Sequence, residues 1–329
     1  MMKVTIGIPV YGVERYVERC ARSLFAQTYE DIEFLFIDDC SPDRSIEIIC
    51  TILKEYPNRE HQVRVFRHKK NKGLAAARNT AVELATGKFI LWVDSDDYIE
   101  KDAVEKLVYR QRETNCDICT FNYIVHRCNS EYVKKDSPFA TSRQHTKAVL
   151  RREASVAIWN KFIRTSLYKE NMIVAEEGIN MGEDFQVSPR LLYYAKSTSH
   201  LDTALYHYDK TGATSITKRF TVEMNRQMWR AYDIIEEFFR DKDDDFVDAL
   251  NISKLWIVVQ NLIISTKCPK TAKGIFYQDA MARLLEIDRK YWKYQPVFKR
   301  IILCICTYQK LMDIYVSLCR AINGKYYKF

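Results

Sequence analysis

With 329 residues, the chain is long enough for one large domain with an appended region or for two domains. Its residues are 47% hydrophobic and 29% charged, and it holds only 9 glycines and 7 prolines, which argues against disorder or long flexible linkers. The net charge of +8 is uneven, because residues 291–329 hold seven Lys or Arg residues against a single acid.

That basic C-terminal segment is also rich in Tyr and aliphatic residues, a composition that suits an acidic membrane surface or a nucleic acid. No nucleic-acid-binding motif accompanies it, so we expect no nucleic acid and favour the membrane surface. No run approaches the roughly 18 apolar residues of a membrane span, and the N-terminal apolar run is too short for a signal peptide. We therefore expect a cytoplasmic protein, peripheral at most at the inner face of the membrane.

Short apolar runs alternate with helical patterns through the N-terminal third of the chain. Each apolar run is too short for a helix with its own core face and ends at polar or turn residues. This alternation predicts an α/β fold with a parallel sheet and right-handed crossovers. Strands are predicted at residues 4–10, 34–37, 63–66 and 89–93, and helices at residues 14–27 and 45–56, with a turn at 71–79 that leads into an alanine-rich helix ending at about residue 86.

Carboxylates follow two of these predicted strands. Asp94, Asp96 and Asp97 come directly after the strand at 89–93, and Asp39 follows the strand at 34–37. Ligands of open α/β sheets sit beyond the carboxyl ends of the strands, so both groups should line one site. Oxygen-only ligands favour Mg²⁺ or Mn²⁺, although acids that begin a helix would look the same. The chain has neither a G-x-G-x-x-G turn nor a Walker-type loop to handle phosphates, which also favours a metal.

Past residue 100 the pattern predicts a helix to about Thr114, a strand at 118–125 and a loop or short hairpin at 129–142. Asp184 precedes an amphipathic helix, where it is either a cap or a base aimed into the cleft. His207 lies in a strand-like run at 205–208, and a histidine between tyrosines is more often packed than a ligand. Lys218 and Arg219 are read as solvated charges, or as a clamp on a phosphate.

From residue 221 the pattern changes to helices without interleaved strands. The last of them carries apolar and basic residues, which suits packing on its neighbours or a position at a membrane surface. Acceptor, membrane or oligomer contacts are the expected uses of this region. Helices are predicted at residues 222–240, 245–265, 272–289 and 297–322.

Several short motifs follow one another along the chain: I-P-V-Y at 8–11, I-D-D at 37–39, N-x-G at 71–73, A-R-N at 77–79, D-S-D at 94–96 and G-E-D at 182–184. In this order they resemble the motifs of family 2 glycosyltransferases, which have the GT-A fold. Linked motifs in matching order are more specific than any single one. The resemblance covers residues 3–219 and divides the chain into a GT-A domain at 1–219 and a helical region at 220–329.

The resemblance implies roles for individual residues. Asp184 would be the catalytic base, and Asp96, with Asp94, would bind Mn²⁺ or Mg²⁺, with His207 as a further candidate near the metal. The remaining roles concern the donor and the acceptor. Pro9, Tyr11, Asp39, Arg78, Asn79 and Asp94 would bind the nucleotide-sugar, and Trp159, Asn160, Lys161 and Glu183 would form the acceptor side.

The reaction that the resemblance implies is inverting transfer of a hexosyl or N-acetylhexosaminyl group from a nucleotide-sugar, with a UDP-sugar favoured. The acceptor would be a saccharide or a lipid-linked saccharide in polysaccharide or glycolipid assembly, and a homo-oligomer stays open. A metal-dependent nucleotidyltransferase or sugar-nucleotide hydrolase is the first alternative, because carboxylate-held metals serve those reactions too. A non-catalytic nucleotide-sugar-binding scaffold is the second.

Overall fold

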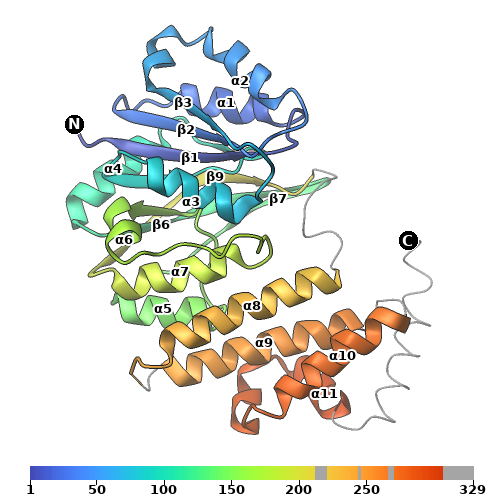
Figure 1. The fold of residues 1–329 in the computed structure, drawn as a ribbon. Coiled ribbons are helices and arrows are strands. Elements are labelled where there is room, and N and C mark those ends of the chain that lie inside the picture. Colours follow the sequence, from blue (N-terminus) through green and yellow to red (C-terminus); the bar gives the residue numbers. More distant parts are fainter. Residues whose placement is uncertain (212–220, 244–245, 266–269, 307–329) are drawn as a thin grey trace. The chain divides into compact units, whose positions relative to one another are not determined.

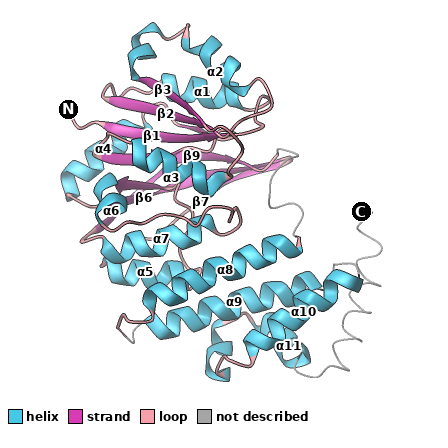
Figure 2. Ribbon diagram, viewed as in Figure 1, coloured by secondary structure: helices cyan, strands magenta, loops and turns pink. Residues whose placement is uncertain are grey.

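The computed structural model describes residues 1–211, 221–243, 246–265 and 270–306. The chain divides into two compact units. One comprises Met1–Val149 with Glu153–Ile216, and the other comprises Leu150–Arg152 with Thr217–Phe329. The first unit contains one sheet flanked by helices, and the described residues of the second are helical (Figure 1, Figure 2).

The N-terminal half of the first unit follows the predicted alternation. Its elements are β1 (Val4–Val10), α1 (Val17–Phe25), β2 (Ile32–Asp38), α2 (Ser45–Leu53), a 3-10 segment (Pro57–Gln62), β3 (Val63–Arg67), α3 (Leu74–Leu84) and β4 (Phe89–Trp92). The four strands pair in parallel in the order β3-β2-β1-β4. Every residue of β1 and β2 is buried, as expected of central strands covered on both faces. Because the four strands are parallel, their carboxyl ends meet at one edge of the sheet.

Beyond β4 the sheet becomes mixed. Its further elements are β5 (Tyr98–Ile99), α4 (Ala103–Thr114), β6 (Ile118–Arg127), β7 (Ser130–Lys134), α5 (Ser142–Leu150), β8 (Lys161–Arg164), α6 (Thr165–Glu170), α7 (Glu183–Tyr194) and β9 (Thr198–Asp209). The strand β8 pairs antiparallel with β4 and β6, whereas β9 runs parallel to β6 and carries β5 on its other side. Through this order β9 brings residues from near position 207 beside the turn that follows β4.

The described helices of the second unit are α8 (Val222–Phe239), α9 (Val247–Ser265), α10 (Lys270–Leu284), a 3-10 segment (Arg289–Tyr294) and α11 (Val297–Cys306). The helix α9 packs against α8, α10 and α11 and is the core helix of this unit. Among the described residues it is also the one helix long and apolar enough to cross a membrane, and 61% of that window is buried inside the protein. Burial of this kind is what a core helix shows.

The predicted elements lie close to the observed ones, with two informative differences. The predicted strand at 205–208 is the end of the longer β9, whose first half, Thr-Ser-His-Leu-Asp-Thr-Ala, is polar and only partly buried. Without apolar alternation, that half is specified by pairing with β6 rather than by its own sequence. The helix predicted at 272–289 ends at Leu284. The part of the last predicted helix beyond Cys306 lies outside the described residues, as do Lys218 and Arg219.

Gly87, between α3 and β4, has no room for a side chain. A Cβ atom on Gly87 would lie 2.3 Å from the backbone nitrogen of Thr5, and the Gly87 N–H donates to the Thr5 hydroxyl (2.9 Å). Gly87→Ala should therefore push β1 from its place and lower the free energy of unfolding by about 1–3 kcal/mol. Urea denaturation followed by circular dichroism measures the change.

Gly274→Ala is the matched control for that substitution. Gly274 lies inside α10, and no described atom lies within 4 Å of its Cβ position. Because alanine is the better helix former, this variant should keep or raise stability, by up to about 1 kcal/mol. A Gly87→Ala protein with the wild-type denaturation midpoint would contradict the close approach of Gly87 to β1.

Candidate active site

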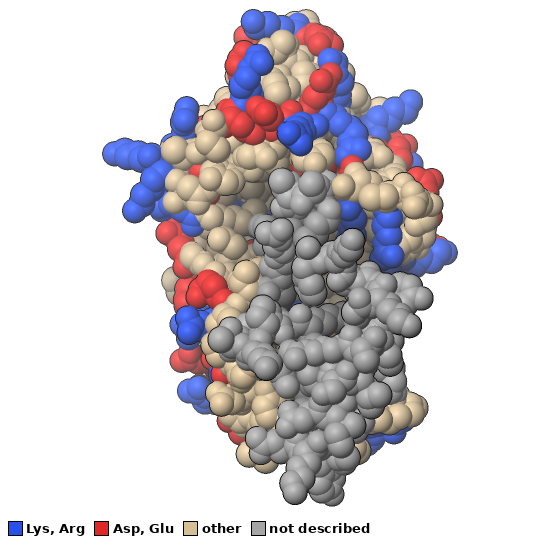
Figure 3. All heavy atoms as spheres, turned by 90° about the vertical axis from the view of Figure 1, so that its right-hand side faces the viewer, with Lys and Arg blue, Asp and Glu red and all other residues tan. Residues whose placement is uncertain are grey.

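The carboxyl ends of β1, β2 and β4 form the edge that the sequence marks with acids. Tyr11 follows β1, Asp39 follows β2, and the D-x-D turn, defined here as residues 94–97, follows β4. Pro9 is buried within β1 opposite Ile37, whereas Tyr11 is 51% exposed. Figure 3 looks at the side of the molecule where β1 and β2 end and shows both acidic and basic side chains over its described part.

Asp39 orders the loop that precedes α3. Its carboxylate is buried and accepts hydrogen bonds from His68 Nδ1 (2.6 Å) and from the backbone N–H groups of Lys72 (2.9 Å) and Gly73 (2.7 Å). The other ring nitrogen of His68 bonds to Thr80 Oγ1 (2.9 Å) on α3. The predicted donor-binding aspartate thus stands at the expected edge, with most of its hydrogen-bonding capacity used to shape the loop beside it.

Arg78 joins three carboxylates. Its side chain is only 6% exposed, and its guanidinium donates to Asp94 (2.9 Å), Glu183 (3.2 Å) and Asp184 (2.5 Å). Asp94 belongs to the D-x-D turn, and the two other acids begin α7, so one buried cation links two segments far apart in the sequence. A buried charge needs such partners, since an unpaired one is costly.

The electrostatics of the two acids of α7 differ from those of surface carboxylates. Burial, followed by the charge of Asp184, raises the pKa of Glu183 to about 8. Burial also raises the pKa of Asp184, against the opposing effect of Arg78. Both acids therefore bind a proton more tightly than surface carboxylates do. The Asp184 side chain is 16% exposed.

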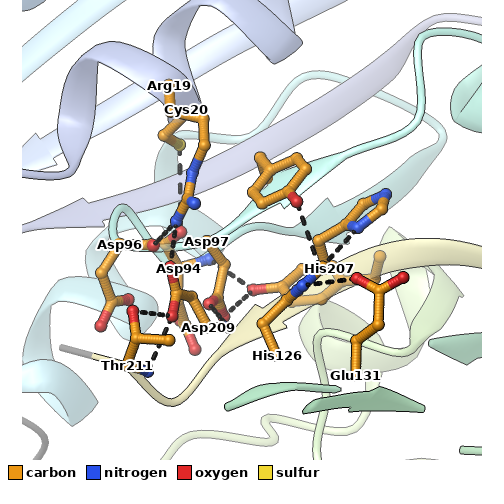
Figure 4. A network of polar contacts seen from close by, with 12 residues as sticks. Arg19, Cys20, Asp94, Asp96, Asp97, His126, Glu131, His207, Asp209 and Thr211 are labelled. Carbon is orange, nitrogen blue, oxygen red and sulfur yellow. Dashed lines mark hydrogen bonds and ion pairs between the residues drawn. The ribbon is translucent and has the colours of Figure 1, made fainter. Parts of the chain in front are cut away.

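The D-x-D turn presents its three acids in different ways (Figure 4). Asp97 is buried and accepts from the Tyr206 hydroxyl (2.7 Å) and from the backbone N–H of Asp209 (2.7 Å). Asp94 is held by Arg78. Asp96 accepts no side-chain hydrogen bond from the other described residues, and burial together with the charge of Asp94 raises its pKa to about 6.

The donor set of this turn fits a divalent cation that prefers oxygen. Asp94 and Asp96 supply carboxylates alone, and no group of three His, Cys, Asp or Glu side chains able to hold a metal occurs among the described residues. Mg²⁺ and Mn²⁺ suit such sites, because they retain waters and share substrate phosphates instead of filling a protein cage. Burial, and then the nearby carboxylate of Asp94, raises the pKa of Asp96, and a bound cation would lower it.

His207 lies one strand away from the predicted metal ligands, and both of its ring nitrogens are engaged. Nε2 bonds to Glu100 (2.9 Å) and Nδ1 to His126 (2.9 Å), and the ring stacks on Tyr98 at 4.1 Å. This arrangement corresponds to a packed and satisfied histidine, as the sequence around it favoured. The parallel ring contact follows from strand pairing, which places Tyr98 opposite His207.

Three residues predicted to contact donor or acceptor instead bond within the protein. Asn79 pairs through its amide with the backbone N–H and C=O of Ala175 (3.0 and 2.8 Å). Asn160 and Lys161 are fully buried, and the Lys161 ammonium donates to the Ala157 carbonyl (2.6 Å) among other oxygens. The polar atoms of these three side chains bond within the protein, so the side chains help to fix the local path of the backbone.

Trp159, also predicted on the acceptor side, is 7% exposed and stacks on Tyr206 at 4.5 Å.

Three residues without a predicted role bond to the D-x-D turn. They are Tyr206 and Asp209 on β9 and Arg19 on α1. Their sequence neighbourhoods contain no motif, because the contacts depend on how α1 and β9 are placed by the sheet.

The chain is similar to known glycosyltransferases in sequence and in fold. The family model described as glycosyl transferase family 2 matches residues 5–171. Glycosyltransferase GlyA of Streptococcus pneumoniae serotype 4 is 29% identical over 218 residues, which is 63% of this chain and 30% of that protein. The chain thus spans less than a third of the length of that relative.

Two solved structures share the fold. S. aureus TarS 1-349 in complex with UDP-GlcNAc has a TM-score of 0.76 at 21% identity and covers 100% of this chain and 94% of its own. Mannosyltransferase PcManGT from Pyrobaculum calidifontis, in complex with GDP-Man and Mn²⁺, has a TM-score of 0.51 at 13% identity and covers 95% and 88%. The predicted α/β fold with a C-terminal helical region is confirmed. With the family model matching half of its residues, the chain belongs to glycosyl transferase family 2.

Proposed function

We propose that the chain is an inverting glycosyltransferase that moves a sugar from a nucleoside-diphosphate sugar, by preference a UDP-sugar, to a hydroxyl group of a saccharide or lipid-linked saccharide. The observation that carries the proposal is the Arg78 contact, which holds the start of α7 and the D-x-D turn on one guanidinium. Inversion needs a base on one face of the sugar and a stabilised leaving group on the other, and this contact brings candidates for both together.

Asp184 takes the proton of the acceptor hydroxyl. At the same time the hydroxyl oxygen of the acceptor attacks the anomeric carbon of the sugar, and the bond from that carbon to the diphosphate breaks. General base catalysis of this kind contributes about 10²–10⁴-fold. The raised pKa of Asp184 brings its basicity closer to the operating pH, which favours proton transfer. Arg78 orients the carboxylate, and Glu183 remains protonated beside it, so the neighbouring acid adds no second charge.

Asp94 and Asp96 would hold Mn²⁺ or Mg²⁺. When bound, that cation neutralises the charge on the departing nucleoside diphosphate as a Lewis acid. Two solved relatives of the same fold support a nucleotide-sugar donor and a divalent cation, one with UDP-GlcNAc and the other with GDP-Man and Mn²⁺. They favour a hexosyl or N-acetylhexosaminyl donor here.

The nucleotide would bind where β1 and β2 end. Tyr11 offers an exposed ring beside Asp39, whose backbone N–H is fixed by the carbonyl of Val10 (3.0 Å). An aromatic face and a carboxylate acceptor suit the stacking and hydrogen bonding of a nucleobase and ribose. The loop that Asp39 holds at Lys72 and Gly73 forms the adjoining wall.

The helical region at 220–329 is the proposed place for acceptor, membrane-surface or oligomer contacts. On α11 the side chains of Val297 and Ile301 are 63% and 53% exposed, and Arg300 beside them is exposed as well. Exposed apolar side chains next to a cation suit an anionic membrane surface, where a lipid-linked acceptor would be found.

The role of Asp184 is tested by Asp184→Asn, which keeps size and polarity but removes the base. We expect UDP release from a panel of UDP-sugars with Mn²⁺ and an acceptor to fall by about 10²-fold or more, with UDP binding retained. Asp202→Asn is the matched control, because Asp202 is a 71% exposed acid on β9 that pairs with Lys135. Full activity of Asp184→Asn, or equal loss in both variants, would contradict the assignment.

The raised pKa values of Asp184 and Glu183 predict how kcat/KM depends on pH. Because the base must be ionised, kcat/KM should fall as pH drops through the raised pKa of Asp184, at higher pH than an ordinary aspartate would give. Glu183→Gln mimics the protonated acid and should keep activity within about threefold at pH near 7, diverging from the wild type above about pH 8. A pH–rate profile of both proteins measures this, and a large loss at neutral pH would show that ionised Glu183 is required.

A further inference from the structure

Arg19 on α1 reaches the D-x-D turn from outside the donor set. Its Nη2 donates to the backbone carbonyl of Asp96 (3.2 Å) and to Asp209 Oδ2 (2.6 Å), and its guanidinium lies over the Tyr98 ring at 4.3 Å (Figure 4). The Arg19 side chain is 43% exposed, whereas that of Asp209 is 8% exposed. One partly exposed cation thus touches the turn and the end of β9 together.

Hydrogen bonds connect Asp209 to the other residues of the D-x-D turn. Its backbone N–H donates to Asp97 Oδ1 (2.7 Å), and the other oxygen of Asp97 accepts from the Tyr206 hydroxyl (2.7 Å). The Tyr206 oxygen in turn accepts from the backbone N–H of Asp94 (3.1 Å). The hydrogen bonds form an unbroken path from Arg19 through Asp209, Asp97 and Tyr206 to Asp94.

This path fixes the turn at the atoms that aim its carboxylates. The backbone N–H of Asp94 bonds to Tyr206, and the backbone C=O of Asp96 accepts from Arg19. The Asp97 side chain accepts from the same Tyr206 hydroxyl. Partners of this outer kind set the orientation of metal ligands, and their loss typically costs about 10–100-fold in metal affinity. A partly exposed ion pair, by contrast, contributes little to stability.

We propose that Arg19, acting through Asp209, is a positioning residue that holds the D-x-D turn in the geometry required to bind a divalent cation. This inference rests on the proposed function, which makes Asp94 and Asp96 the metal ligands. Arg19 contacts neither carboxylate of that pair and is not itself a catalytic residue. If it were only a cross-link between α1 and β9, its removal would change stability and leave metal affinity unchanged.

The test is a titration of MnCl₂ into the protein, with and without UDP, in which electron paramagnetic resonance reports free Mn²⁺. We expect Arg19→Gln to raise the Mn²⁺ dissociation constant about tenfold. Arg19→Lys keeps the charge next to Asp209 and should recover part of the affinity. The double variant Arg19→Gln/Asp209→Asn should be no weaker than the weaker single variant, because both changes break one contact.

Arg22→Gln is the matched control. Arg22 lies one turn further along α1, is 39% exposed and pairs with Glu18 and Glu55, away from the turn. It should lose a similar surface ion pair, and therefore a similar small amount of thermal stability, while keeping the wild-type Mn²⁺ affinity. Melting temperatures of both variants complete the comparison.

The outcomes separate this inference from the function on which it rests. Wild-type Mn²⁺ affinity in Arg19→Gln, or an equal loss in Arg22→Gln, would overturn the positioning role and leave the metal site standing. A wild-type protein that binds no Mn²⁺ in either arm, or whose binding survives Asp96→Ala, would remove the proposed D-x-D metal site and the role of Arg19 with it.

Discussion

The contact between Arg78 and three carboxylates is the interaction on which the candidate site depends. Without a buried cation, Asp94 and Asp184 would repel each other in a region shielded from water, and one or both would take up a proton or move apart. With it, the start of α7 is tied to the turn after β4, and Glu183 is a third partner of the same guanidinium. The same arginine therefore holds the proposed base in place, and its charge opposes the rise in pKa that burial causes.

The three acids of the D-x-D turn differ in whether their side chains are hydrogen-bonded to other described residues. Asp94 is tied to Arg78, and Asp97 is tied to Tyr206 and Asp209, so the turn is held from both sides. Asp96 is the one of the three without a side-chain hydrogen bond to another described residue. A rigid turn that leaves a single carboxylate uncompensated suits a cation that arrives with the substrate, because little reorganisation is then needed on binding.

The fold and the placement of the acids were predictable from local patterns, and the network around them was not. Apolar runs that end in Asp39 and Asp94 indicate strands and a shared sheet edge because strand burial is written in consecutive residues. Contacts of Arg19 with Asp209 join positions 190 apart, and no short-range pattern records them. His207 shows the same limit, because the residues around it favoured a packed histidine but could not name its partners, which strand pairing with β5 makes Tyr98 and Glu100.

Lys161, on the predicted acceptor side, is fully buried and bonds within the protein. The ammonium of Lys161 is enclosed by oxygens of Ser155, Ala157 and Asn160, and burial lowers its pKa to about 8. A buried cation satisfied by carbonyls fixes the path of the backbone around it, since any shift would leave the charge without partners. That backbone seats Trp159 against Tyr206. The buried charge of Lys161 therefore helps to fix the position of Trp159, another residue of the predicted acceptor side.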